Sequence, residues 1–564
     1  MYRGCAASDA MGMMTAYNAV NGVPMCANDP FTNKLARDTW GFKGTVVTDC
    51  GAVSDLYKLN GYKNGTAAAW AALRGGTDIE CGNTIKENAK PEMEHLLRQA
   101  VERSFTVRMR TGEFDRRGQA STDEPYDRAS HSKLAYRAAV QGAVLLKNTG
   151  GALPLSLGST VALGGPMKDA TWEALGNYAP VLHNNDWPDS PNVMSPLQAM
   201  KQCGLGDKLI VLPEGPYICS TTDDTIPGFL EFPEKPAADV VVIVAGLYCQ
   251  DPEVMDVDKR PETSGKCQSG CLESEGCDRP NLQLPSGQRA LIRRAANWGI
   301  PVILVVIAGG PLDLSEFAHN DAVKAILWMG YPGQTVGTAM ARMLFGFDSP
   351  SGRLPHTLYK GSYTDAVSMK QMNLRPDPRT GYPGRTYRFV DPVQVLYPFG
   401  YGLSYYSWKY EWLKASGAAG SAPMDMDALM QTTSTSTPEF SSCQVRLKVS
   451  REGEGSAHGE ASTSVLLFLS PPHHAVAGAP RQKLAKFERI SGNGGELVFR
   501  LGAEDFMLAD GDGHFSLQMG AWIATVGTPA ELQAKIEVGS KGCQMTPRLC
   551  PKSGHPHHSG RPSP

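Results

Sequence analysis

Two long runs of branched apolar residues constrain the fold of this chain more than any other feature. ADVVVIVAGL (238–247) and IPVILVVIAGG (300–310) hold almost no polar side chains, and each ends at or near glycine. A strand that is apolar on both faces is typical of a parallel sheet covered by helices on each side. STVALGGP (159–166) and AVKAILWMGYPG (322–333) have the same character, and the amphipathic GQRALIRRAANWG (287–299) lies between the two longest runs. The pattern predicts an α/β fold.

The first part of the chain also alternates strand and helix signals, which indicates parallel βα units. We expect strands at MMTAYNAV (13–20), TVV (45–47) and TDIECG (77–82). We expect helices at FTNKLARDTWG (31–41), GTAAAWAALRGG (65–76) and within the segment 90–114.

The character of the chain changes from about residue 395. CQVRLKVS, STSVLLFLS and GELVFRLG are examples of short strands separated by turn residues, a spacing typical of a β-sandwich. The predicted division of the chain is an α/β region at 1–125, a second α/β region at 126–365, a linker at 366–394, a β-sandwich at 395–540 and a disordered tail at 541–564.

Charge and hydropathy exclude some classes of partner. The chain has 54 basic and 57 acidic residues and a net charge of −3, with no block of like charge. We therefore expect neither nucleic acid nor a membrane surface as partner. No apolar stretch reaches the ~18 residues of a membrane-spanning helix, and the first residues lack the apolar core of a signal peptide.

Four of the thirteen cysteines cluster at Cys249, Cys267, Cys271 and Cys277. Zinc sites in proteins are formed by cysteine or histidine ligands that occur in closely spaced pairs. No histidine lies near this cluster, so disulfides or free thiols are favoured over a metal site.

Asp49 follows the predicted strand 45–47 almost directly. In parallel βα folds, reactive groups gather at the carboxyl ends of the strands. The structural alternative is a helix N-cap or a turn residue, because aspartate is common in both roles. On spacing alone, the structural alternative is favoured.

A second acidic cluster lies in CLESEGCDRPNLQLP (271–285), which holds Glu273, Glu275, Asp278 and Arg279. It is either a solvated surface loop or a loop that carries a catalytic carboxylic acid. Two carboxylates on opposite sides of a sugar bond are what glycoside hydrolysis requires.

Nine motifs follow one another in the order of a known family. They are YNAVNGVPMCAN (17–28), WGFKGTVVTDCGAV (40–53), GTDIECG (76–82), VLLKNTGGALPL (144–155), ESEGCDR (273–279), GYPGQ (330–334), GRLPHTLY (352–359), GYPGRTYRF (381–389) and YPFGYGLSY (397–405). With them the chain resembles glycoside hydrolase family 3, and specifically its β-xylosidase/α-L-arabinofuranosidase branch.

The resemblance implies roles for individual residues. Asp49 matches the family nucleophile and Glu275 the acid/base, with Glu273 as the alternative. Tyr17 matches an aromatic residue that lines the sugar site. Cys50 matches a cysteine typical of the xylosidase branch, at a position where glucosidases more often have tryptophan. The resemblance also suggests a disulfide between Cys50 and Cys81.

The implied architecture is the C-terminal part of a (β/α)8 barrel, then an α/β sandwich, then a fibronectin type III-like β-sandwich. The implied activity is that of a retaining exo-β-xylosidase acting on xylo-oligosaccharides, with no cofactor and no metal. Activity on β-glucosides or α-L-arabinofuranosides, or a non-catalytic carbohydrate-binding role, are the alternatives. The family implies an extracellular or cell-wall location.

Two departures from the family qualify these expectations. Only 48 residues precede Asp49, whereas an eight-stranded barrel needs about 200 or more. We therefore expect an N-terminally truncated barrel and a chain that is inactive or nearly inactive by itself. The loop between Gly246 and Glu275 holds 28 residues, which is longer than is usual for the family.

Overall fold

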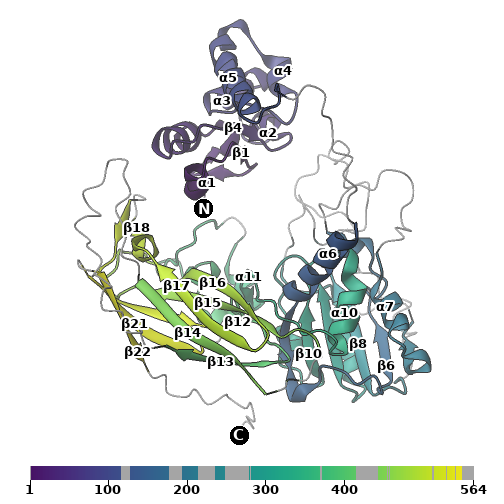
Figure 1. Ribbon diagram of the computed structural model, residues 1–564. Helices are drawn as coiled ribbons and strands as arrows, with labels where there is room; N and C mark the ends of the chain where they lie inside the picture. Colours follow the sequence, from purple (N-terminus) through teal and green to yellow (C-terminus); the bar gives the residue numbers. More distant parts are fainter. Residues whose placement is uncertain are drawn as a thin grey trace. The chain divides into compact units, whose positions relative to one another are not determined.

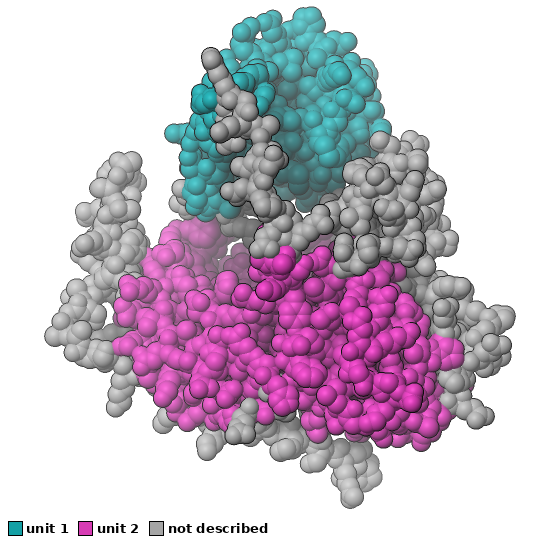
Figure 2. Space-filling model, turned by 45° about the vertical axis from the view of Figure 1, so that its right-hand side comes forward, with its two compact units in different colours: residues 1–126 teal, residues 127–564 magenta. Residues whose placement is uncertain are grey.

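The computed structural model describes most of the chain, including every element discussed below (Figure 1). The described residues are 2–115, 128–176, 193–213, 235–247, 273, 279, 281–368, 371–413, 443–453, 455, 458–510, 514–528, 530–539 and 542–548. Glu275 and the cysteine cluster at 249–277 lie outside them. The chain divides into two compact units, residues 1–126 and residues 127–564 (Figure 2).

The first unit is built around two parallel strands, β1 (Gly12–Thr15) and β4 (Thr45–Thr48). The strand predicted over 13–20 stops at Thr15. A short hairpin of β2 (Ala19–Val20) and β3 (Val23–Pro24) follows it, because Asn21 and Gly22 take the left-handed conformation of a tight turn. The strand predicted over 77–82 is reduced to one bridge between Val47 and Ile79.

Helices surround these strands, and small residues allow them to pack closely. Alanines of α3 contact Cys26, Val53 and Leu56 in a core where every one of these side chains is almost fully buried. The α-helices and the π-helix of the unit are α1 (Tyr2–Ala7), the π-helix η2 (Pro30–Thr39), α2 (Ala52–Lys58), α3 (Gly65–Arg74), α4 (Thr84–Asn88) and α5 (Glu94–Arg110).

The second unit begins with a six-stranded sheet in the order β5-β10-β9-β8-β6-β7. All neighbouring pairs are parallel except β5 and β10, which are antiparallel. The strands are β5 (Val144–Asn148), β6 (Val161–Gly164), β7 (Leu209–Val211), β8 (Val240–Gly246), β9 (Val302–Ile307) and β10 (Val323–Trp328).

Alternate residues of each central strand enter two different cores. Val242 and Val244 of β8 pack with α6 (Arg128–Gly142), α7 (Pro196–Gln202) and α10 (Val336–Leu344) on one face. Val241 and Ile243 pack with α8 (Ser286–Ala296) and α9 (Ser315–Ala318) on the other. This double burial confirms the α/β fold predicted from the apolar runs, and Figure 1 shows α6, α7 and α10, the helices of the first face, beside the sheet.

The C-terminal part consists of two antiparallel sheets that share one core containing the fully buried Trp522. A disulfide between Cys443 and Cys543 joins the two sheets. The first sheet has the order β13-β14-β17, from Ser407–Trp412, Cys443–Glu452 and Gly494–Leu501. The second has the order β16-β15-β20-β21-β22, from Lys483–Ser491, Ser462–Ser470, Gly520–Val526, Leu532–Gly539 and Gly542–Arg548.

Helices with the length and hydrophobicity needed to cross a bilayer do not occur in the described parts of the chain.

Candidate active site

Asp49 lies immediately beyond the carboxyl end of β4 and is half-buried. Its backbone N–H donates to the carbonyl of Thr15 at 2.9 Å, which ties it to the end of β1. Its Oδ1 accepts from the backbone N–H of Cys50 at 2.8 Å. The following helix α2 has Gly51 as its N-cap and no side-chain cap, so Asp49 does not cap it. Among the described residues, no hydrogen-bond donor reaches Oδ2.

The turn that carries Asp49 is held from three sides. Cys50 forms a disulfide with Cys81, which confirms the predicted pairing. The hydroxyl of Tyr17 donates to the carbonyl of Cys50 at 2.7 Å, and Tyr17 is 40% exposed. Gly51 takes a positive φ of 81°, which suits glycine, and its N–H donates to the carbonyl of Cys81 at 2.7 Å. The structure thus brings Asp49, Tyr17 and the disulfide into one constrained turn.

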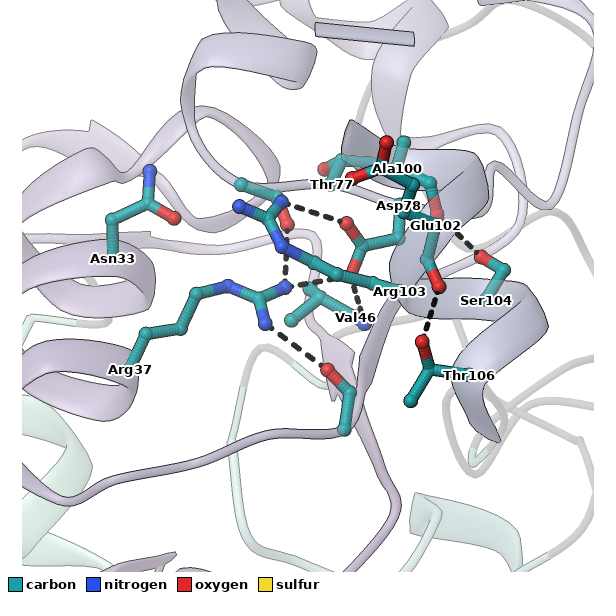
Figure 3. A network of polar contacts seen from close by, with 12 residues as sticks. Asn33, Arg37, Val46, Thr77, Asp78, Ala100, Glu102, Arg103, Ser104 and Thr106 are labelled. Atoms are coloured by element: carbon teal, nitrogen blue, oxygen red, sulfur yellow. Dashed lines mark hydrogen bonds and ion pairs between the residues drawn. The ribbon is translucent and has the colours of Figure 1, made fainter. Parts of the chain in front are cut away.

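A fully buried carboxylate, Asp78, fixes the strand that leads to this turn (Figure 3). Asp78 Oδ2 accepts from Arg37 Nη2 at 2.6 Å and from the backbone N–H of Val46 at 2.9 Å. Its Oδ1 accepts from Arg103 Nη1 at 3.0 Å. Arg37 also donates to the carbonyl of Gly44 at 3.0 Å. Burial lowers the pKa of the Arg37 guanidinium, and the charge of Asp78 opposes this shift.

This network was not predicted from the sequence. Asp78 lies within TDIECG, and its partners stand 41 and 25 residues away in two different helices. TDIECG holds two acidic residues, Asp78 and Glu80, and its sequence alone does not indicate which of them is buried. A buried carboxylate needs such partners because an isolated charge is costly to remove from water.

In the second unit, Glu273 lies at the carboxyl ends of β8, β9 and β10. Its Oε2 accepts from the backbone N–H of Gly309 at 2.9 Å and from the hydroxyl of Tyr331 at 2.6 Å. Its Oε1 accepts from the N–H of Gly310 at 2.8 Å and lies 3.7 Å from Arg279 Nη2. Only 16% of the Glu273 side chain is exposed. Glu273 is therefore fully engaged with the protein.

Burial and the adjacent carboxylate raise the pKa of the Tyr331 hydroxyl well above its usual range. Burial lowers the pKa of Arg279, and Glu273 opposes that shift. Burial also lowers the pKa of His356, again opposed by Glu273, and the ring of His356 packs edge-on against Trp328 at 5.4 Å. The polar groups around Glu273 are thus largely withdrawn from water, and several of them are directed at this one carboxylate.

The end of β8, just before the loop that leads to Glu273, is closed by a buried glutamine. Gln288 of α8 accepts from the N–H of Gly246 at 2.9 Å and donates to the carbonyl of the same residue at 2.7 Å. Gln288 is fully buried. Both backbone groups at this strand end are therefore satisfied inside the unit.

No group of three or more His, Cys, Asp or Glu residues that could hold a metal ion occurs among the described residues. What the structure describes is an acid at the end of a strand in the first unit and an anchored carboxylate at a sheet edge in the second. An α/β protein with carboxylates at the carboxyl ends of its strands is the class that this geometry defines.

Comparison with protein families identifies the chain further. The N-terminal domain of glycosyl hydrolase family 3 matches residues 2–106, and the C-terminal domain of the same family matches residues 143–405. The chain belongs to glycosyl hydrolase family 3 and groups with its β-xylosidase branch. The predicted family resemblance is confirmed.

Curated relatives agree with this placement. The chain is 32% identical over 546 residues to beta-xylosidase/alpha-L-arabinofuranosidase 2 of Medicago sativa subsp. varia, covering 91% of this chain and 64% of that protein. It is 34% identical over 427 residues to the exo-1,4-beta-xylosidase xlnD of Aspergillus awamori, covering 71% of this chain and 48% of that protein. The chain spans about three fifths of the length of the first curated relatives it matches.

Solved structures share the fold. A family 3 exo-beta-xylosidase, XlnD, in complex with a xylobiose aziridine activity-based probe superposes with a TM-score of 0.78 at 27% identity, covering 96% of this chain and 67% of that one. A beta-glucosidase from Listeria innocua in complex with isofagomine superposes with a TM-score of 0.69, covering 97% of this chain and 69% of that one. At 21% identity, the second likeness concerns the fold alone.

Proposed function

We propose that this protein is a retaining, exo-acting β-xylosidase that removes terminal β-1,4-linked xylose from xylo-oligosaccharides. The observation that carries the proposal is the placement of Asp49. Its carboxylate ends strand β4, Cys50 N–H binds one of its oxygens, and a disulfide and Tyr17 hold its turn. A nucleophilic carboxylate needs such a fixed position and a solvent-accessible oxygen.

The proposed mechanism is a double displacement. Asp49 attacks the anomeric carbon while Glu275 gives its proton to the glycosidic oxygen, so the sugar–oxygen bond breaks and a covalent glycosyl-enzyme forms. Glu275 then takes a proton from water, and the resulting hydroxide displaces Asp49 with net retention of configuration. Retention requires the two carboxyl groups to lie about 5–5.5 Å apart during the reaction. Neither step calls for a metal or an organic cofactor.

Three considerations support a xylose-type substrate. The relatives are named as β-xylosidases, and the similar XlnD structure holds a xylobiose-type probe. Cys50, next to the nucleophile, is much smaller than the tryptophan of many glucosidases. Its side chain is tied to Cys81, so it leaves a fixed and compact wall beside Asp49. Secretion to the cell wall or exterior, where such a substrate occurs, belongs to the same proposal.

A second candidate is α-L-arabinofuranosidase activity at the same site, because two of the relatives carry both activities in their names. Arabinofuranose presents hydroxyls in an arrangement similar to that of xylopyranose. Nitrophenyl β-xyloside, α-L-arabinofuranoside and β-glucoside, compared at equal concentration, separate these two candidates and β-glucosidase activity.

The test of the proposal combines product stereochemistry with one variant. Proton NMR of the first-formed sugar should show the β-anomer of xylose, and Asp49→Asn should abolish turnover. Asp38→Asn is the matched control, because Asp38 is an exposed residue of helix η2 in the same unit. An α-anomer as first product, or full activity of Asp49→Asn, would refute the mechanism.

A further inference from the structure

We propose that Glu273 is a positioning residue: together with Arg279 it anchors the chain on either side of Glu275 to the loop that follows β9. The inference deepens the proposed function and rests on it in one respect, namely the role of Glu275 as the acid/base. It assigns different roles to the two glutamates of ESEGCDR, between which the sequence does not decide.

The contacts of Glu273 are unsuited to a proton donor. The N–H groups of Gly309 and Gly310 and the guanidinium of Arg279 are obligatory donors, and the Tyr331 hydroxyl lies at 2.6 Å. Of the roughly four lone-pair sites of a carboxylate, three accept hydrogen bonds from the two glycine N–H groups and the Tyr331 hydroxyl, and the Arg279 guanidinium adds an opposite charge at 3.7 Å. A carboxylic acid in the same place would direct its own O–H toward groups of which three cannot accept it. Glu273 is thus placed to bind donors rather than to deliver a proton.

Arg279 supplies a second anchor on the same loop. Its Nη2 donates to the carbonyl of Pro311 at 2.8 Å, and its side chain is 14% exposed. Residues 273 and 279 therefore both attach to the three-residue segment Gly309–Pro311. Glu275 follows Glu273 by two residues and precedes Arg279 by four, so in the sequence it lies between the two anchored residues.

The anchoring loop has space for these contacts only because it contains two glycines. A Cβ at Gly310 would lie 2.7 Å from Glu273 Oε1, and a Cβ at Gly309 would lie 2.6 Å from the ring of Tyr331. Tyr331 follows β10, the neighbour of β9, and its ring backs the carboxylate. Glu273 therefore occupies a fitted site made by the loops after two adjacent strands.

The expected consequence is a loss of alignment when the anchor is removed. A general acid contributes roughly 10²–10⁴-fold to a rate, and a misplacement of about 1 Å can cost about 10²-fold. Glu273→Ala should therefore lower kcat by about 10–100-fold for every substrate. Glu275→Ala should instead lose most with poor leaving groups, because these need the proton.

The first experiment compares Glu273→Ala with Glu275→Ala in the full-length protein. Aryl xylosides with leaving groups of different acidity are assayed with and without sodium azide. We expect a steep leaving-group dependence and recovery by azide, with xylosyl azide as product, for Glu275→Ala alone. The same signature in Glu273→Ala would overturn the proposal, since it would identify Glu273 as the proton donor.

The second experiment needs no activity. Hydrogen exchange of the Gly309 and Gly310 amides is measured in Glu273→Gln, which keeps the side-chain shape. In Gln, an NH2 group that cannot accept a hydrogen bond replaces one of the two carboxylate oxygens. At least one of the two glycine amides therefore loses its acceptor, and its exchange should accelerate by about tenfold or more. Glu316→Gln, which breaks an exposed ion pair with Arg293, is the control and should leave both amides unchanged.

The two experiments separate the possible failures. Unchanged exchange at Gly309 and Gly310 in Glu273→Gln would overturn the anchor, whatever the enzyme hydrolyses. A full-length wild-type protein that cleaves no glycoside would overturn the proposed function, while the exchange rates would still decide whether Glu273 holds this loop.

Discussion

The substitution Asp78→Asn tests whether a buried charge network holds the strand that leads to Asp49. The Asp78 side chain is completely buried, and its partners Arg37 and Arg103 are 11% and 31% exposed. Removing one partner of a buried ion pair costs about 3–5 kcal/mol, because the remaining charges lose their compensation. Arg103 is partly screened by solvent, so we place the expected loss of stability near the lower end, at about 3 kcal/mol.

Hydrogen exchange at the end of β4 reports this loss locally. The Thr48 amide donates to Ile79 and the Asp49 amide donates to Thr15, both at 2.9 Å, so both should be protected in the wild type. A loss of about 3 kcal/mol corresponds to roughly 100-fold faster exchange in Asp78→Asn if exchange follows opening of the unit.

Glu94→Gln is the matched control. Glu94 pairs with Arg98 at 2.9 Å on the surface of α5, with side chains 74% and 68% exposed, and such pairs contribute little. We expect less than about a threefold change in the same amides. An acceleration below about fivefold in Asp78→Asn would refute the view that the network fixes β4, and would mean that packing alone holds the strand.

Two further predictions concern ionisable groups outside the site. Burial lowers the pKa of Lys483 from 10.5 to about 8, so the unfolded chain binds the proton more tightly and stability should rise between about pH 8 and pH 10.5, by about 3 kcal/mol at most. Lys483→Met should remove this rise, and an unaltered difference in Tm between pH 7.5 and pH 9.5 would contradict the assignment. Burial raises the pKa of the Cys26 thiol to about 11, whereas Cys5 is exposed. At pH 8 iodoacetamide should therefore alkylate Cys5 and spare Cys26, as peptide mass mapping would show, and equal modification would argue that this core opens readily.

The sequence predicts well those features that depend on the pattern of neighbouring residues. The apolar runs at 240–246 and 302–307 predict central strands because burial on both faces leaves no polar positions. The place of Asp49 is also predictable, because the acid follows the short β-branched strand directly. The antiparallel direction of β5 at the edge of the sheet is not predictable, because the five residues VLLKN do not indicate the direction of the strand.

The features that the sequence does not predict depend on distant partners. Nothing local separates Glu273 from Glu275, and the difference lies in Gly309 and Tyr331, 36 and 58 residues further along the chain. The same holds for the pairing of Asp78 with Arg37. Such contacts arise from the order in which strands neighbour one another, which hydrophobic periodicity does not encode.

The closure of β8 by Gln288 has a consequence for how this family can vary its loops. A strand that is apolar on both faces could slip along its neighbour by one residue without exposing any polar group, so its hydrophobic pattern alone aligns it weakly. Gln288 recognises both backbone groups of Gly246, and a Cβ there would lie 1.9 Å from the carbonyl oxygen of Ile307, so only glycine fits opposite Ile307. The register of β8 is thus fixed by contacts of Gly246 inside the sheet and not by the length of the connection that follows the strand. Residues inserted after Gly246 should therefore not change the register of β8. The connection that follows β8 can then vary in length and sequence while the strand keeps its position.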